Sequence, residues 1–246
     1  MESSSSPTVV VTNQPVPADG WMKRPEVPTN CPRGLEYLTL MNQLIVYQKK
    51  SLLKIFAGCE TRNKFTLVNS LGQIVYEAKE ESDCLTRYCF GYIRPYEIEV
   101  KDTFGNEVIH VYRRLACDSC CFPCYLQKIE VSSPPGTIVG TIEQEWSIFI
   151  PKFRICDASG NVVLLLRGPC ITSSCCCNDV VFKVLSSDGE TEVGTISKQW
   201  SGIATELFTD ADKFGISFPQ DLDVRMKAVL IGSVFLINSM FFERRN

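Results

Sequence analysis

The chain has 246 residues, of which 45% are hydrophobic and 22% charged, so it is long enough for one large domain with a packed apolar core. Its formal net charge of −3 excludes the basic excess with which many proteins hold nucleic acid, and no specific nucleic acid is expected as a partner. The sequence starts without the charged and long apolar segments of a secretory signal, which predicts a cytosolic protein whose 13 cysteines are thiols.

Residues 1–30 are predicted to form a disordered tail. Five prolines interrupt this segment, and Ser, Thr and Asn fill much of the rest, which leaves little apolar surface to bury. Trp21 is the exception and is a candidate for a small docking point. The folded domain is expected to cover residues 31–246.

A unit of apolar strand, turn ending in glycine, and second strand recurs four times along the middle of the chain. Asp, Asn or Ser begins each turn and can cap it through its side chain, while the glycine accepts a positive φ angle. The four turns are residues 69–72, 102–105, 157–160 and 186–189. This pattern predicts a mainly β protein (α+β once a C-terminal helix is counted) with a largely antiparallel sheet.

Two heptapeptides in the second half of the chain resemble each other. Residues 140–146 read GTIEQEW and residues 194–200 read GTISKQW, and both copies follow a cysteine cluster. We interpret them as one strand unit that occurs twice within a single barrel or sandwich.

The chain is predicted to end in an apolar helix that begins after a cap at Asp221 or Asp223 and runs to about Phe242. Its uncharged part, residues 228–242, is about 22 Å long, whereas a membrane core is about 30 Å thick. The apolar positions are Ala228, Val229, Leu230, Ile231, Val234, Phe235, Leu236, Ile237 and Phe241. The length favours a helix enclosed by the sheet over a membrane span, which would need thinning of the bilayer and snorkelling of the flanking Lys and Arg side chains.

Two cysteine clusters stand between predicted strands. The first consists of Cys117, Cys120, Cys121 and Cys124, and the second of Cys170 and residues 175–177. Adjacent thiols beside aromatic residues suit S-acylation, because several acyl chains anchor a protein that one chain holds only weakly. Zinc binding by the C-x-x-C pairs and simple packing are the alternatives for the first cluster. For the second cluster packing is weighed at least equally with acylation, and packing is the interpretation for the five isolated cysteines.

An acidic segment before the helix resembles part of an EF-hand loop. Four of its residues occupy loop positions 1, 3, 6 and 12, while Ile216 at position 7 offers a backbone carbonyl. The candidate calcium ligands are Asp210, Asp212, Gly215, Ile216 and Asp221. Phe214 occupies loop position 5, where an EF-hand loop has an oxygen ligand. The site would therefore be weak, with a Kd of about 10⁻⁴–10⁻³ M. A solvated turn followed by helix caps is the alternative interpretation.

Several motifs, taken in chain order, together resemble the phospholipid scramblase family. They are CPRGLEYL at 31–38, CCFPC at 120–124, PPGT at 134–137, GPC at 168–170, GTISKQWSG at 194–202, DADKFG at 210–215, MKAVLIG at 226–232 and FFE at 241–243. Each motif is modest alone, but the set spans nearly the whole chain.

The resemblance implies a tubby-like fold, which is a closed twelve-stranded antiparallel barrel around a central C-terminal helix. It implies palmitoylation of Cys120, Cys121 and Cys124, together with Cys117, and a calcium segment at 210–221. The implied activity is ATP-independent, calcium-triggered movement of membrane phospholipids between leaflets, so no covalent catalysis is expected. The implied location is the cytoplasmic face of the plasma membrane or an endomembrane. The family is usually described with one C-terminal membrane span, whereas the helix length favours the barrel.

The chain departs from the family pattern at a few positions. Phe122 and Tyr125 thin the cysteine run, and Lys213 adds a positive charge within the acidic segment. A single short helix offers no polar groove for lipid headgroups, so translocation would require homo-oligomers or opening of the barrel. A lipid-binding adaptor that does not move lipid, and a metal-binding regulator, are the other two functional hypotheses.

Overall fold

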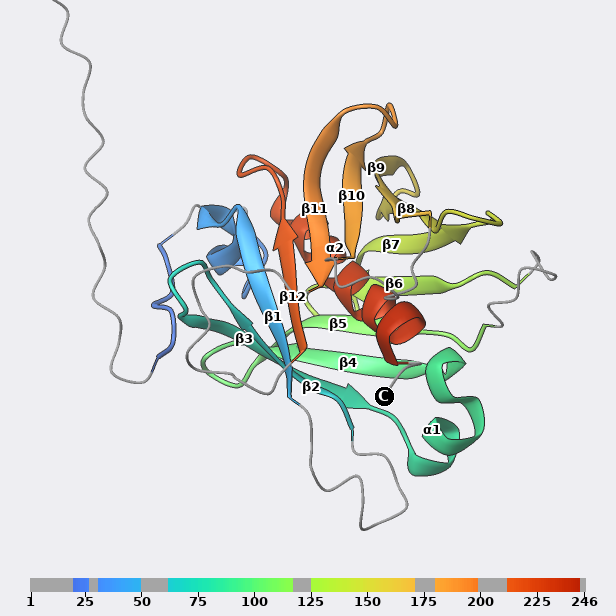
Figure 1. Cartoon of the computed structure of the whole chain (residues 1–246). Coiled ribbons are helices and arrows are strands. Elements are labelled where there is room, and N and C mark those ends of the chain that lie inside the picture. The colour runs from blue at the N-terminus through green and yellow to red at the C-terminus, as the bar shows by residue number, and fades with distance from the viewer. Residues whose placement is uncertain are drawn as a thin grey trace, which may run out of the picture.

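The computed structural model describes residues 20–26, 31–49, 62–116, 125–170, 180–198 and 212–243. Its strands form one closed barrel in which every strand pairs antiparallel with its neighbours in sequence and β1 closes onto β12 (Figure 1). The strands are β1 (Gln43–Lys49), β2 (Lys64–Val68), β3 (Ile74–Glu81), β4 (Tyr96–Lys101), β5 (Glu107–Arg113), β6 (Lys128–Ser132), β7 (Ile138–Glu145), β8 (Lys152–Asp157), β9 (Val162–Arg167), β10 (Val181–Ser186), β11 (Glu192–Lys198) and β12 (Asp212–Ser217). The predicted twelve-stranded closed barrel is confirmed.

One long helix fills the barrel. The helical elements are η1 (Glu36–Leu40), α1 (Cys84–Phe90), η3 (Gly91–Ile93), α2 (Val224–Ile237) and its continuation as a π-helical turn, η4 (Asn238–Phe242). The Asp223 carboxylate caps α2 by accepting from the Arg225 N–H at 2.7 Å. Nearly all of α2 is buried, and its apolar side chains form one core with the inward side chains of the strands. The predicted enclosed C-terminal helix is therefore confirmed.

The four predicted glycine turns each join two consecutive strands. In the turn between β4 and β5, the Asp102 carboxylate accepts from the Phe104 and Asn106 N–H groups, both at 2.9 Å. Gly105 completes this turn with a φ of 78°, which a residue with a Cβ atom adopts only at a cost. The side-chain cap and the glycine thus act together, as the sequence pattern predicted.

The up-and-down order gives the barrel two unlike ends. The turn end carries the short connections β2–β3, β4–β5, β6–β7, β8–β9 and β10–β11, and α2 begins there. The loop end carries the longer connections β1–β2, β3–β4, β5–β6, β7–β8, β9–β10 and β11–β12. Because α2 starts at the turn end and runs through the barrel, η4 reaches the loop end, where it contacts η3, the element that follows α1 (Figure 1).

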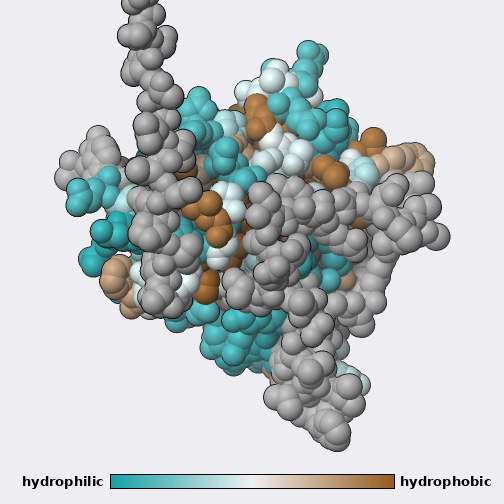
Figure 2. All heavy atoms as spheres, turned by 60° about the vertical axis from the view of Figure 1, so that its left-hand side comes forward, coloured by the Kyte–Doolittle hydropathy of each residue, from teal (hydrophilic) through white to brown (hydrophobic). Residues whose placement is uncertain are grey.

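The outside of the barrel is largely polar, apart from small apolar groups such as Ile45, Tyr47 and Val68. In β4, for example, apolar residues such as Ile98 are buried and alternate with charged residues such as Glu99 that face outward. The face in Figure 2 likewise shows hydrophilic side chains over most of its described surface, with apolar residues in separate patches. A barrel that crosses a membrane carries its apolar band on the outside, so this wall has the opposite pattern.

The repeated heptapeptides occupy equivalent places in β7 and β11. Each strand carries a register shift just before the repeat's glycine, because Ser132 pairs with Ile138 and Leu185 pairs with Glu192. A Cβ atom on Gly194 would lie 2.1 Å from the Ser217 carbonyl oxygen, and one on Gly140 would meet a neighbouring backbone oxygen in the same way. The glycine in each copy therefore permits close approach of the next strand.

Gly194→Ala is expected to destabilise the fold by about 3 kcal/mol, since the added methyl group has to push a backbone strand aside. Gly105→Ala is the control, because a Cβ atom there meets nothing within 4 Å and the cost is only about 1 kcal/mol from its positive φ angle. Urea unfolding of both variants measures the difference. Equal losses would show that the β11–β12 approach is not tight.

Part of the predicted tail lies against the barrel. Trp21 forms a parallel bridge with Ile74, and the Met22 N–H donates to the Ile74 carbonyl at 2.8 Å. Residues 1–19 and 27–30 lie outside the described residues. Among residues 20–26, Trp21 thus contacts the start of β3.

Candidate functional site

Lys227 fixes the beginning of α2 at the turn end. It is fully buried, and its ammonium group donates to the carbonyl oxygens of Leu38 at 3.0 Å, Met41 at 2.8 Å and Gln220 at 2.8 Å. Burial lowers the pKa of Lys227, although the charge of Asp221 acts in the opposite direction. The three carbonyl groups around the ammonium tie the first turns of α2 to η1 and to the segment after β12.

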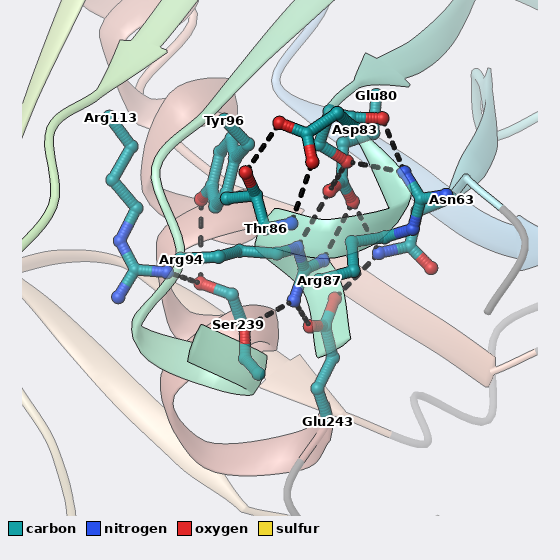
Figure 3. A network of polar contacts seen from close by, with 12 residues as sticks. Asn63, Glu80, Asp83, Thr86, Arg87, Arg94, Tyr96, Arg113, Ser239 and Glu243 are labelled. Carbon is teal, nitrogen blue, oxygen red and sulfur yellow. Dashed lines mark hydrogen bonds and ion pairs between the residues drawn. The ribbon is translucent and has the colours of Figure 1, made fainter. Parts of the chain in front are cut away.

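A buried ion-pair network holds the other end of the helix (Figure 3). Arg94 donates to both Glu80 carboxylate oxygens at 2.8 Å, and to the Glu243 carboxylate at 2.7 Å. Asn63 also donates to Glu80 at 2.6 Å and to Glu243 at 2.7 Å. One guanidinium group therefore joins β3, the start of β4 and the residue that follows η4.

A second buried arginine contacts the helix at the same end. Arg113, on β5, donates to the Gln127 side-chain oxygen at 3.0 and 2.8 Å and to the Ser239 hydroxyl at 3.1 Å. Gln127 in turn donates to the Ala116 carbonyl at 2.9 Å. The Tyr96 and Ser239 hydroxyl groups lie 3.4 Å apart (Figure 3). The contacts of Arg113 thus link η4 to both flanks of the β5–β6 connection.

Glu80 is charged at neutral pH despite its burial. Burial alone would raise its pKa, but hydrogen bonds and charge from Arg94, with hydrogen bonds from Ser82 and Asn63, outweigh this effect and lower it. Because the folded pKa lies below the ordinary value of 4.5, the stabilisation is complete above about pH 4.5 and disappears as pH falls through the folded pKa.

Unfolding at acid pH tests whether the protonation of Glu80 destabilises the fold. The parent chain is expected to lose stability steadily as pH falls below about 4.5, whereas Glu80→Gln should be less stable at neutral pH and show a weaker slope in that range. Fluorescence-detected urea unfolding at a series of pH values measures both. A Glu80→Gln slope as steep as the parent's would assign the acid sensitivity to other carboxylates.

The helix is long enough to raise the question of a membrane span. Val224–Phe242 has 19 residues and the length and composition of a spanning helix, yet 83% of its apolar 18-residue stretch is buried inside the barrel. To cross a bilayer it would have to leave the Lys227, Arg94 and Arg113 contacts and empty the core. The geometry is that of an internal helix pinned at both ends.

The predicted acylation cluster, Cys117, Cys120, Cys121 and Cys124, lies outside the described residues. Its described flanks, Ala116 and Tyr125, lie between β5 and β6 and therefore belong to the loop end. The second cluster begins at Cys170, which is an exposed thiol after β9, and its other cysteines lie outside the described residues.

The isolated cysteines differ in part from the prediction of buried thiols. Cys156 is buried and Cys31 half-buried, and burial is the main cause of the raised pKa of each thiol. Cys89 is exposed, however, and Cys84 is exposed and disulfide-bonded. Both lie on the short helix α1, on a side that does not pack against the core. The expectation that every cysteine is a thiol was therefore wrong for Cys84. Cys59 lies outside the described residues.

The predicted calcium ligands are distributed along β12 and beyond it. Asp212, Gly215 and Ile216 are in this extended strand, Asp221 follows in the turn before α2, and Asp210 lies outside the described residues. A strand rises about 3.3 Å per residue, so Asp212 and Ile216 stand at different levels of the barrel.

The Asp212 carboxylate lies 3.5 Å from the Lys198 ammonium group. Within the described ranges, no three His, Cys, Asp or Glu side chains gather closely enough to hold a metal ion. Among the described candidate ligands, Asp212 thus lies beside the Lys198 ammonium group and does not form a metal cluster with Asp221.

The sequence analysis missed the buried charges that hold the helix. Strand alternation contained a signal for two of them, because Tyr76, Ala78 and Glu80 share the inward face of β3. Arg113 likewise follows the inward positions of β5. A charged residue that continues an inward apolar row predicts a buried polar partner.

The sequence was compared with known families, proteins and structures. The family model described as Scramblase matches residues 22–244. Phospholipid scramblase 1 of Mus musculus is 52% identical over 224 residues, covering 91% of this chain and 68% of the relative. Phospholipid scramblase 2 of Bos taurus is 52% identical over 223 residues, covering 91% and 76%. Phospholipid scramblase family member 5 of Homo sapiens is 47% identical over 212 residues, covering 86% and 78%. No solved structure matches the chain.

Proposed function

The chain belongs to the phospholipid scramblase family, and from that premise we propose that it moves phospholipids in both directions between membrane leaflets without ATP. The observation that carries this proposal is the 52% identity to a phospholipid scramblase over 91% of the chain. The movement breaks no covalent bond, so the protein acts as a lipid translocator and not as a covalent catalyst.

The enclosed helix implies that something other than α2 attaches the barrel to its membrane. Acyl chains on Cys117, Cys120, Cys121 and Cys124 would supply this attachment from the cytoplasmic face, since several chains hold a protein where one does not. The described flanks of this cluster at the loop end support that orientation. Membrane attachment that hydroxylamine releases, and that a Cys120/Cys121/Cys124→Ala variant lacks, is the expected result.

Calcium is proposed as the trigger, bound weakly by the carboxylates before and at the start of β12. Asp212 begins β12 at the loop end and Asp210 stands two positions before it in the sequence, and lipid phosphates can complete the coordination of a cation bound there. Asp210→Ala should abolish the calcium response, while Asp221→Ala, at the turn end, should leave it intact. The opposite outcome would move the cation to the other end of β12.

Reconstitution into vesicles tests the function itself. Fluorescent phospholipid in the inner leaflet should become accessible to dithionite when protein and calcium are present, and should stay protected when calcium is chelated. Varying the number of chains per vesicle shows whether movement requires a homo-oligomer. A vesicle-bound protein that leaves the inner-leaflet lipid protected would contradict the proposal.

That outcome would favour a lipid-binding adaptor, which is the second candidate. The observation behind it is the filled barrel, because α2 occupies the interior and the described residues give no lipid path along it. The vesicle assay separates the two, since an adaptor binds the membrane without exposing inner-leaflet lipid.

A further inference from the structure

Exposed apolar side chains mark two connections of the loop end. On α1, between β3 and β4, Leu85 is 76% and Tyr88 is 83% exposed. Between β7 and β8, Ile148 is 61% and Phe149 is 72% exposed. Exposing large apolar side chains to water costs free energy, so two pairs of them at the same end of the barrel are candidates for a covered surface.

The strand order fixes how these two connections are arranged. Going around the loop end, α1 comes first, the β5–β6 connection follows, and the Ile148–Phe149 pair comes third. In the same region η4 contacts η3, which packs against α1 (Figure 1). At the loop end, the two apolar pairs therefore flank one sector of the rim.

Rows of cations on the outer wall border this sector on both sides. On one side, Lys64 of β2 stands directly opposite Lys49 of β1 and Lys79 of β3. On the other side, Arg167 of β9 stands directly opposite Lys152 of β8 and Lys183 of β10. Lys49, Lys64, Lys152 and Arg167 are all terminal strand residues at the loop end.

Like charges directly opposite each other destabilise a sheet, so two such rows need a compensating role. Three of the six cations have a carboxylate neighbour: Lys49 has Glu77 at 3.9 Å, Lys79 has Glu81, and Lys183 has Glu192 at 2.9 Å. Within the described part of the chain, Lys64, Lys152 and Arg167 form no ion pair, and Glu145, which stands opposite Lys152 on β7, contacts Arg154 at 3.6 Å. Glu99, the residue opposite Lys79 on β4, is bound by Lys101 at 2.8 Å. The central residue of each row is thus available to an external anion.

We propose that the loop end is a docking surface for an anionic lipid leaflet. Leu85, Tyr88, Ile148 and Phe149 enter the boundary between headgroups and acyl chains, and the two cation rows contact lipid phosphate and carboxylate groups at either side. Apolar tips bordered by cations are complementary to such a surface and not to a neutral apolar groove. The inference deepens the proposed function, because it supplies the orientation in which the barrel meets its substrate.

Flotation of the unacylated full chain with vesicles tests this surface. The chain should bind vesicles that contain phosphatidylserine, and should bind pure phosphatidylcholine vesicles much more weakly. Ile148→Ser/Phe149→Ser should reduce binding about tenfold or more. Lys64→Glu/Arg167→Glu should also reduce it about tenfold or more, but only on the anionic vesicles.

Matched controls come from the turn end. Leu71 is 62% and Phe104 is 68% exposed there, so Leu71→Ser/Phe104→Ser removes similar apolar area from the end that is not proposed to meet the membrane. Arg33→Glu/Arg225→Glu reverses two exposed charges near the start of α2. Both controls should bind as the parent does. Equal losses in the controls and the loop-end variants would overturn the docking surface, and so would dissociation of a dimer by the Ile148/Phe149 change in the absence of lipid.

The proposed docking surface and the proposed lipid movement are contradicted by different results. Parent protein that floats as expected but leaves inner-leaflet lipid protected contradicts lipid movement and keeps the docking surface. Loop-end variants that float like the parent overturn the docking surface while the scrambling assay still reports on lipid movement. Unchanged thermal unfolding of each variant confirms that it is folded.

Discussion

Arg94→Met is expected to lower the free energy of unfolding by about 3–5 kcal/mol. The change removes the cation that Glu80 and Glu243 share, and among the described residues it leaves the buried Glu80 carboxylate with Asn63 and Ser82 as its side-chain donors. Breaking a buried pair from one side is costly because the remaining charge has no counterion. Differential scanning calorimetry should show Tm falling by roughly 6–20 °C, at about 2–4 °C per kcal/mol.

Arg154→Met is the matched control for this experiment. Arg154 lies on the outer wall of β8, where it contacts Glu143 at 3.3 Å and is 44% exposed. An exposed ion pair contributes only about 0–1 kcal/mol, so Tm should barely change. Similar losses in the two variants would show that the Arg94 network does not hold the helix.

Lys227→Met is expected to cost about 3 kcal/mol. The substitution keeps an unbranched side chain of similar length but removes the donor that three buried carbonyl groups share. Each buried acceptor left without a partner costs about 1–3 kcal/mol, partly offset because no charge is buried. Urea unfolding measures the loss. Lys128→Met, which removes a surface contact to Glu143, should stay within about 1 kcal/mol of the parent, and an equally small effect at Lys227 would contradict its anchoring role.

The two anchors act on opposite ends of one helix, so their losses should add when combined. They are far apart along α2 and share no partner, which is the condition under which stability changes are additive. The helix therefore depends on both polar anchors as well as on its apolar packing.

The architecture was predictable from local patterns because the barrel has an up-and-down order. Each strand pairs with its neighbours in sequence, so the four recurrent turns, such as 102–105, already define four of the strand pairs. The charge-free segment from Ala228 was short for a membrane, and the closed sheet accounts for its burial. The strand number came from the family resemblance, whereas the length of the helix already favoured its enclosure by the sheet.

The polar anchors were not predictable because their partners are distant in sequence. Arg94 and Glu243 are 149 positions apart, and Arg113 and Ser239 are 126 apart. The acidic segment shows the opposite difficulty, since its spacing suited a calcium loop while pairing with β1 and β11 draws it into a strand. Tertiary pairing thus overrides a local motif, and position 5 of that motif, Phe214, serves the core.

Photocrosslinking from the middle of α2 tests the enclosed helix most directly. The Phe235 ring lies 4.9 Å from the Phe65 ring of β2, centroid to centroid. A diazirine-bearing phenylalanine analogue at position 235, irradiated in calcium-loaded vesicles that are moving lipid, is expected to crosslink to peptides of the barrel wall that include Phe65. Crosslinks to phospholipid acyl chains in place of that peptide would contradict an internal helix.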